Sequence, residues 1–281
     1  MAISKKTEPS STGHLRPLMR AFVLSAVLPL VGCASGPATQ SGFLSNYQGL
    51  DHPGEGLDAG IAAHSDGKAV GAITEIYIAP AILKLPADSS LSQAELNQVV
   101  HEVDRQVCFH LSKHFVIAPA PAPGVPTLRV AVVRIAPTGQ ISSGVSAATR
   151  FFIPVPLVKV RLPMGNGGLA TEAELVTGDG SQVAAMVWSK DAQVVGRLQP
   201  SLSRVGDALQ LAQPYGDKVS KYLSTGKADL PIPSPDPCAA YGPRPSIGSR
   251  IAEGATGAVT GLYIPPSSKT ATKVADNTTS Q

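Results

Sequence analysis

The chain has 281 residues, 43% of them hydrophobic, so it is long enough and apolar enough to bury a core of its own. It carries 23 basic and 20 acidic residues, and four of the basic but only one of the acidic residues lie within residues 1–32. The rest of the chain is formally neutral, which excludes nucleic acid as an expected partner because no basic field is left to attract phosphates.

The first 32 residues have the pattern of a secretory signal. A basic stretch with Lys5, Lys6, Arg16 and Arg20 precedes an apolar run over residues 21–31. A membrane-spanning helix needs about 20 apolar residues, so this run is too short to cross a bilayer. The pattern therefore predicts a signal peptide over residues 1–32.

The end of this run, Leu30-Val31-Gly32-Cys33, resembles the lipobox of bacterial lipoproteins. The resemblance implies cleavage between Gly32 and Cys33, a diacylglyceryl thioether on Cys33 and acylation of its new amine. In such lipoproteins, an aspartate directly after the lipidated cysteine commonly favours retention in the inner membrane. Ala34 stands at this position instead, so the resemblance implies a lipid anchor in the outer membrane, with the protein facing the periplasm. The alternative is an ordinary cleaved signal with an incidental cysteine.

Two cysteines, Cys108 and Cys238, remain after Cys33. In an oxidising periplasm they can form a disulfide. The alternative is a pair of buried thiols that act as small hydrophobic side chains. The sequence leaves both possibilities open.

Composition divides the mature chain into three parts. Residues 33–70 are rich in Gly, Ala and Ser, which predicts a lipidated tether, although its apolar cluster (residues 42–44, Tyr47 and Leu50) either docks on the domain or moves with the tether. Residues 71–226 are predicted to form a periplasmic domain. Residues 227–281 form a Pro/Gly-rich extension that is expected to be largely disordered.

Hydrophobic periodicity predicts an α+β domain with two layers: a mostly antiparallel sheet and two amphipathic helices. The predicted strands are residues 72–79, residues 127–136 and a hairpin of residues 169–177 and 182–190. The first helix runs from a cap at Ser90 or Ser92 to about Phe115, and the second covers residues 202–223, interrupted by Pro214. Residues 141–162 contain Pro154 and Pro156 and are read either as an edge strand or as a hydrophobic surface segment.

The sequence indicates no catalytic residue, no metal site and no cofactor. His110 and His114 are four residues apart on the first helix, a spacing at which two histidines can bind one metal ion. However, no third ligand stands at a recognisable spacing. Residues 165–170 match the letters of a dinucleotide-binding loop, but a strand follows where a helix is required. Glu172 and Glu174 share one strand face, which we read as a solvated hairpin face in preference to a catalytic pair of carboxylates.

Three stretches together resemble an uncharacterised family of proteobacterial lipoproteins with a domain of unknown function. They are SGFLSNYQGL, which begins at Ser41, FFIPVPL, which begins at Phe151, and EAELVTGDGSQVAAMVW, which begins at Glu172. The resemblance covers roughly residues 33–224 and implies anchoring and a fold, but no activity. The turn Gly178-Asp179-Gly180 departs from the Thr-Gly-Glu expected of the family.

The predicted function is that of a non-enzymatic outer-membrane lipoprotein whose periplasmic domain binds or assists another component of the cell envelope. Its expected partners are the membrane, through the N-terminal lipid anchor, and an envelope protein contacted by Phe151 and Phe152. A lipid- or glycan-binding module is the alternative, and an envelope hydrolase is a third possibility.

Overall fold

The computed structural model describes residues 40–51, 60–87, 89–139, 159–160, 166–193, 195–196, 198–199, 201–244 and 263. Contacts divide the chain at the predicted cleavage site into two units, Met1–Gly32 and Cys33–Gln281, and every described residue belongs to the second. Gly32, Cys33, Phe151 and Phe152 lie outside the described residues, so their predicted roles stay predictions.

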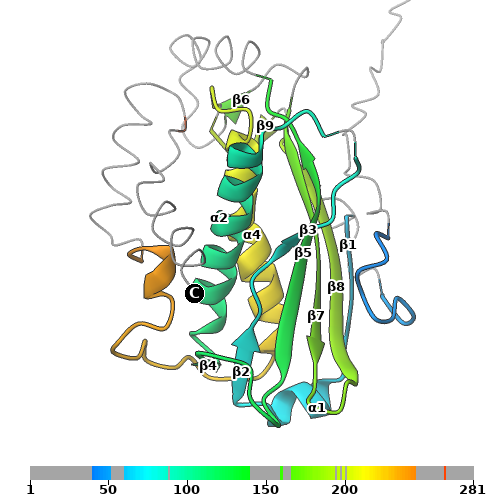
Figure 1. The fold of residues 1–281 in the computed structure, drawn as a ribbon, viewed down its shortest axis with the longest axis vertical. Coiled ribbons are helices and arrows are strands. Elements are labelled where there is room, and N and C mark those ends of the chain that lie inside the picture. Colours follow the sequence, from blue (N-terminus) through cyan, green and yellow to red (C-terminus); the bar gives the residue numbers. More distant parts are fainter. Residues whose placement is uncertain are drawn as a thin grey trace, which may run out of the picture. The chain divides into compact units, whose positions relative to one another are not determined.

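One mixed sheet of seven strands forms the centre of the domain (Figure 1). Its strands follow the order β1-β8-β7-β5-β2-β4, with β3 paired to β5. They are β1 (Ile61–Ser65), β2 (Glu75–Ile78), β3 (Ile82–Leu83), β4 (Val116–Ala118), β5 (Thr127–Ala136), β7 (Gly168–Val176) and β8 (Gln182–Asp191). The pairs β1–β8, β8–β7 and β7–β5 are antiparallel, whereas β2, β3 and β4 join by parallel pairing.

Strands β5, β7 and β8 lie within one residue of the predicted bounds, whereas the strand predicted over residues 72–79 is shorter and begins three residues later, as β2. Alternation of apolar residues in β5 and in the β7–β8 hairpin makes each strand contribute side chains to both faces of the sheet. Both faces are covered, which is why the burial pattern of β7 is almost continuous. In the predicted segment 141–162 the structure describes only β6 (Lys159–Val160), which pairs with β9 (Val195–Gly196) in a separate small sheet.

Two long helices, α2 (Gln93–Leu111) and α4 (Gly206–Leu223), cover one face of the sheet (Figure 1). Ser92 caps α2 and forms a capping box with Glu95, which explains where that helix begins. Helix α4 continues through Pro214. Buried side chains from both helices and the inner sheet face, including Trp188 and Tyr215, form the main core. The α+β class with two amphipathic helices on one sheet is confirmed.

The prediction that the tether extends to residue 70 is wrong. Strand β1 is the edge strand beside β8, and the short helix α1 (Gly67–Ala72) follows it with Asp66 as its N-cap. Residues 40–51 also lie against the sheet, on the face opposite the helices (Figure 1). The apolar cluster of residues 43, 44, 47 and 50 therefore docks on the domain.

The prediction of disorder after residue 226 is wrong for the part that the structure describes. Residues 227–244 cross the end of α2 as an extended strap that ends in a short 3-10 helix, η2 (Ala239–Tyr241). Lys227 donates to the carbonyls of Gly71 and Ile73, at 3.1 and 2.6 Å, and its ammonium lies 5.0 Å from the centre of the Phe115 ring. Polar and cation–π contacts thus hold the beginning of this Pro-rich segment.

Candidate functional site

The outer face of the sheet, opposite the helices, contains two buried carboxylates. Glu172 and Glu174 alternate with inward residues along β7, and the two residues are 0% and 1% exposed. Their neighbours on β8 are Val187 and Ala185. The prediction of a solvated hairpin face is wrong, because residues 41–47 cover both carboxylates.

Glu172 binds both ends of the covering segment. The backbone N–H of Ser41 donates to its Oε1 at 2.7 Å, and the Ser41 hydroxyl donates to its Oε2 at 2.8 Å. The phenol of Tyr47 donates to the same Oε2 at 2.6 Å. Three donors therefore satisfy this fully buried side chain, as a polar group away from water requires.

Glu174 binds the middle of the segment and ties it to the neighbouring strands. Ser45 donates to it through its backbone N–H at 2.7 Å and through its hydroxyl at 3.2 Å. Gln182 of β8 donates its amide at 2.7 Å, and Arg129 of β5 lies 2.9 Å from Oε1. The second carboxylate is thus held by contacts from three parts of the chain.

Apolar contacts complete the docking. Leu44 is buried against Ala185 and Val187. The centre of the Phe43 ring lies 5.2 Å from the guanidinium carbon of Arg129. Gly42 has a φ of +75°, a conformation that L-residues rarely adopt, and it turns the chain between Ser41 and Phe43.

Tyr47 closes the turn from within. Its hydroxyl accepts the N–H groups of Phe43 and Leu44 at 2.8 and 3.2 Å while it donates to Glu172. Burial, together with the neighbouring Glu172 carboxylate, raises the pKa of Tyr47 above its ordinary value. The motif Ser-Gly-Phe-Leu-Ser-x-Tyr therefore acts as one docking unit, which we call the N-terminal clasp (residues 41–47).

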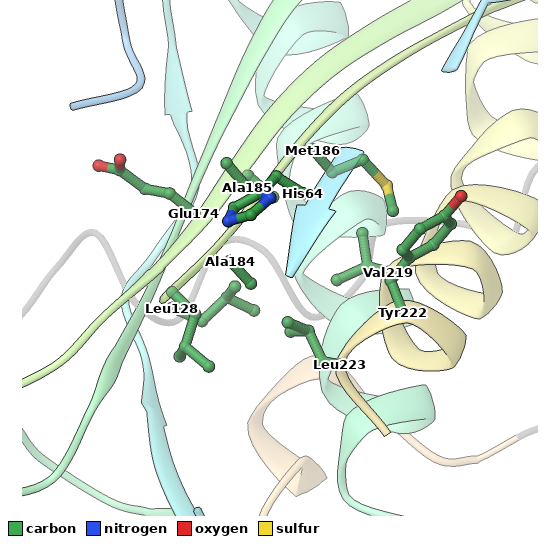
Figure 2. Close-up of a pocket in the computed structure, with 11 residues that line it drawn as sticks. His64, Leu128, Glu174, Ala184, Ala185, Met186, Val219, Tyr222 and Leu223 are labelled. Carbon is green, nitrogen blue, oxygen red and sulfur yellow. The ribbon is translucent and has the colours of Figure 1, made fainter. Parts of the chain in front are cut away.

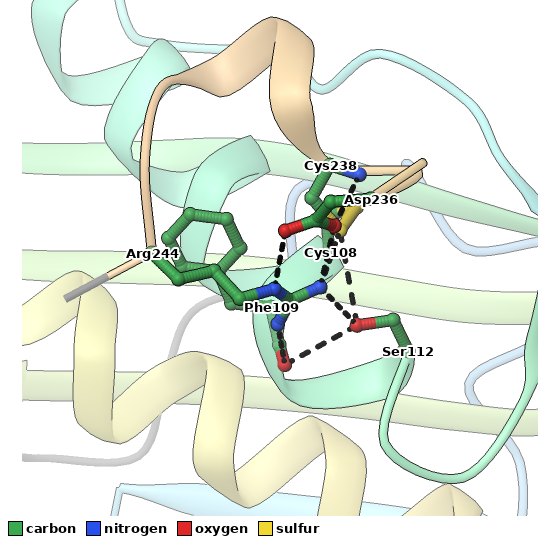
Figure 3. A network of polar contacts seen from close by, with 6 residues as sticks. All are labelled: Cys108, Phe109, Ser112, Asp236, Cys238 and Arg244. Atoms are coloured by element: carbon green, nitrogen blue, oxygen red, sulfur yellow. Dashed lines mark hydrogen bonds and ion pairs between the residues drawn. A yellow bond between two sulfur atoms is a disulfide. The ribbon is translucent and has the colours of Figure 1, made fainter. Parts of the chain in front are cut away.

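A second constellation fastens the strap to α2 (Figure 3). Cys108 of α2 and Cys238 form a disulfide with an Sγ–Sγ distance of 2.01 Å. Beside it, Arg244 makes a bidentate pair with Asp236 at 2.5 and 2.8 Å. These hydrogen bonds lower the pKa of Asp236. The strap is thus joined to α2 both covalently and by an ion pair.

The guanidinium of Arg244 also caps the end of α2. It donates to the Phe109 carbonyl at 3.1 Å and to the Ser112 hydroxyl at 2.8 Å (Figure 3). It lies 4.8 Å from the centre of the Phe109 ring as well. An arginine from the strap therefore occupies a helix C-terminus, where a cation is favoured.

The helix histidines point to different partners. His110 lies 3.9 Å from Asp217 of α4, whereas His114 lies 3.4 Å from Asp229 of the strap. His101 contacts the Tyr241 ring edge-on at 5.8 Å. Within the described part of the chain, no three His, Cys, Asp or Glu side chains gather as a metal site would require. The spacing of His110 and His114 does not bring them to one ligand.

Asp104 is a buried acid that the sequence analysis did not single out. It lies on α2, is 6% exposed and accepts the backbone N–H of Ala81 at 2.9 Å. Burial raises its pKa to about 7, although the hydrogen bond from Ala81 opposes that shift. Asp104 therefore makes the stability of the helical layer depend on pH.

A cavity opens between α4 and the hairpin, lined by residues of both sheet faces and of the helix (Figure 2). Leu128, Ala184, Val219 and Leu223 supply apolar walls, and His64 lies at its edge. It has room for no more than about one water molecule, whereas a ligand pocket usually offers about 300 Å³ or more. This cavity gives no support to a lipid- or glycan-binding role. Over the described residues, no helix is both long and apolar enough to cross a membrane.

Two solved structures resemble the fold distantly. Both are PelC dodecamers from Paraburkholderia phytofirmans, with 15% and 13% sequence identity and TM-scores of 0.34 and 0.35. The first match covers 59% of this chain and 97% of the PelC chain, and the second covers 58% and 96%. No curated protein matches the chain significantly.

One family model matches well over half of the chain. It spans residues 39–219, from just before the N-terminal clasp to within α4, and leaves the strap outside. The matched region contains both buried glutamates and the segment that they hold. The chain belongs to the DUF3313 family, whose members are described as proteins of unknown function.

Proposed function

We propose that this chain is a non-enzymatic outer-membrane lipoprotein whose periplasmic domain binds or assists another component of the cell envelope. The observation that carries the proposal is the docking of the N-terminal clasp on Glu172 and Glu174. The clasp begins only eight positions after the lipobox cysteine, so it fixes the junction between the proposed anchor and the domain.

The disulfide supports the proposed compartment. Disulfides persist in oxidising environments such as the periplasm and are rare in the reducing cytosol. Cys108 and Cys238 are 130 positions apart and join two separate parts of the fold. Such a bond matches a chain that is exported by a signal peptide.

The arrangement of the polar groups supports a binding role rather than catalysis. The buried glutamates accept hydrogen bonds from Ser41, Ser45 and Tyr47, which makes them structural acceptors. His110 and His114 face separate carboxylates. A catalytic base would need to lie within reach of a substrate in an open site.

The anchor is tested by Cys33→Ala, expressed in a Gram-negative host with an alkyne analogue of palmitate. The unchanged protein is expected to carry the label and to fractionate with the outer membrane, whereas the variant loses both. Ser35→Ala is the matched control and keeps both. Ala34→Asp is expected to keep the label and move to the inner membrane. A Cys33→Ala protein that stays in the outer membrane would contradict the proposal.

We assign the partner contact to Phe151 and Phe152, because the segment that they begin is the most apolar part of the chain outside the signal. The paired change Phe151→Ser and Phe152→Ser is expected to abolish crosslinking to an envelope protein in intact cells. Resistance to protease and the presence of the disulfide check that the domain stays folded. Unchanged crosslinks from the folded variant would remove these residues from the contact.

A further inference from the structure

The N-terminal clasp fixes the point at which the chain leaves the domain. Ser41 is held by two hydrogen bonds to Glu172, a residue of a central strand. Tyr47 binds the same carboxylate from the other end of the clasp. The exit point therefore lies on the outer sheet face, opposite α2 and α4 (Figure 1).

The chain between this point and the proposed anchor is short. Seven residues separate Cys33 from Ser41, so even a fully extended chain spans no more than about 28 Å between them. A folded domain of about 200 residues has a radius of roughly 21 Å, so its opposite side lies roughly 65 Å away along the surface. The helical face is therefore out of reach of a membrane that holds Cys33.

The surface around the clasp has the chemistry of a membrane contact. The Lys84 ammonium lies close to Gly42, and the side chains of Arg129 and Arg134 are 44% and 40% exposed. The carboxylates beneath them, Glu172 and Glu174, are buried, whereas Asp191, which pairs with Arg134, is 44% exposed. The charge of Arg134 is therefore offset at the surface, and the positive charge beside the clasp comes from Lys84 and Arg129. Basic side chains near an anionic leaflet strengthen binding to the membrane surface.

An exposed apolar side chain lies on the same face. Ile82 of β3 is 50% exposed and pairs with Ala131, whose side chain contacts Phe43 of the clasp. Because paired residues of neighbouring strands point to one face, Ile82 stands beside the clasp. Interfacial binding commonly combines apolar and basic side chains in this way.

From these observations we propose that the outer sheet face, covered by the N-terminal clasp and edged by Ile82, Lys84, Arg129 and Arg134, lies against the bilayer surface. Its partner is a membrane with anionic phospholipid headgroups. The helical face and the strap then point away from the membrane, toward other envelope components. This inference rests on the proposed acylation of Cys33.

Energy transfer to the bilayer tests the orientation. The acylated full-length protein is purified and reconstituted into vesicles of phosphatidylethanolamine and phosphatidylglycerol that contain a headgroup-labelled acceptor lipid. A donor fluorophore is attached through an unnatural amino acid at Asn46, exposed in the clasp, or at Ala240, exposed in η2 on the α2 side. Transfer from Asn46 is expected to exceed transfer from Ala240 by about twofold, because roughly a domain diameter separates the two positions from each other.

Equal transfer from the two positions, or stronger transfer from Ala240, would overturn the orientation while leaving the anchor in place. A protein that does not bind the vesicles at all would instead refute the proposed function on which the orientation depends. Glu172→Ala is expected to release the clasp, lengthen the free chain and reduce the difference in transfer. The exposed Glu75→Ala is the matched control and keeps the difference. A full difference in the Glu172→Ala protein would contradict the role of the clasp.

Discussion

The two ends of the domain are fastened by different chemistry. The N-terminal clasp is held on the outer sheet face by hydrogen bonds to two buried carboxylates. The strap is held on α2 by a disulfide and by the Arg244–Asp236 pair (Figure 3). The first fastening is non-covalent and reversible, whereas the second opens fully only if a covalent bond is reduced.

This difference matches what each end has to do in the proposed orientation. The clasp lies beside the membrane and sets the distance of the domain from its anchor. The strap covers the end of a helix on the far side, where a covalent bond keeps it in place without a large apolar interface. We therefore expect each fastening to respond to its own perturbation and to leave the other intact.

The largest effect is expected from removal of the disulfide. In the chain-entropy model, a bridge between residues 130 positions apart stabilises the fold by about 5 kcal/mol. The double change Cys108→Ala and Cys238→Ala should lower the free energy of unfolding in urea by an amount of this order. Amide exchange of Phe43 to Tyr47 should stay slow under native conditions, because the clasp does not depend on the bridge. Fast exchange there would show that the fastenings are coupled.

Asp104, in the helical layer, is expected to make the stability of the fold depend on pH, and this effect involves neither the clasp nor the strap. The pKa of Asp104 is raised to about 7 in the folded protein, from an ordinary value of 3.8. The folded state thus keeps a proton that the unfolded state releases, so the contribution of Asp104 to stability is most favourable below pH 4 and becomes less favourable as the pH rises toward 7. Asp104→Asn should remove this loss and make the protein more stable at pH 8, by at most about 4 kcal/mol. Urea unfolding at pH 4.5 and pH 8 measures it, and an identical pH dependence in both proteins would contradict it.

A smaller effect is expected from Glu172→Ala. Hydrogen bonds to charged groups contribute about 1.5–3 kcal/mol each, but the released donors of Ser41 and Tyr47 regain water, so we expect a loss of about 3 kcal/mol in all. Protease should then cut near Phe43 while the disulfide stays formed. Glu75→Ala, on the exposed side of β2, should change stability by less than about 0.5 kcal/mol. A clasp that stays protected in Glu172→Ala would mean that its apolar contacts suffice.

The sequence predicts much of the fold because local signals were strong. Ser92 and Glu95 form a capping box before an apolar stripe, and α2 begins there. The hairpin of β7 and β8 follows from alternation on either side of the turn at Gly180, whose φ is +87°. In contrast, β1 consists mostly of small residues, and α1 contains Gly67 and Gly71, so neither has a clear pattern.

The candidate site could be predicted only in part. Glu172 and Glu174 are the only charged residues in a mostly apolar strand, a signal that they would be buried and would need donors. Their donors in the clasp lie 125–131 positions earlier, which no local pattern reveals. The proline content of the C-terminal extension predicts a disordered tail. Composition alone does not reveal that Cys238 and Arg244 fix the strap to α2.

The strand order has a consequence for the time at which the domain is completed. Strand β1 pairs with β8, and the clasp binds β7, so the clasp has no partner until β7 is present and β1 has none until β8 is present. Contacts between such distant positions slow folding, because the intervening chain must first be ordered. The N-terminal end of the domain is therefore among the last parts to fold, and its edge strand stays accessible to chaperones and proteases until then.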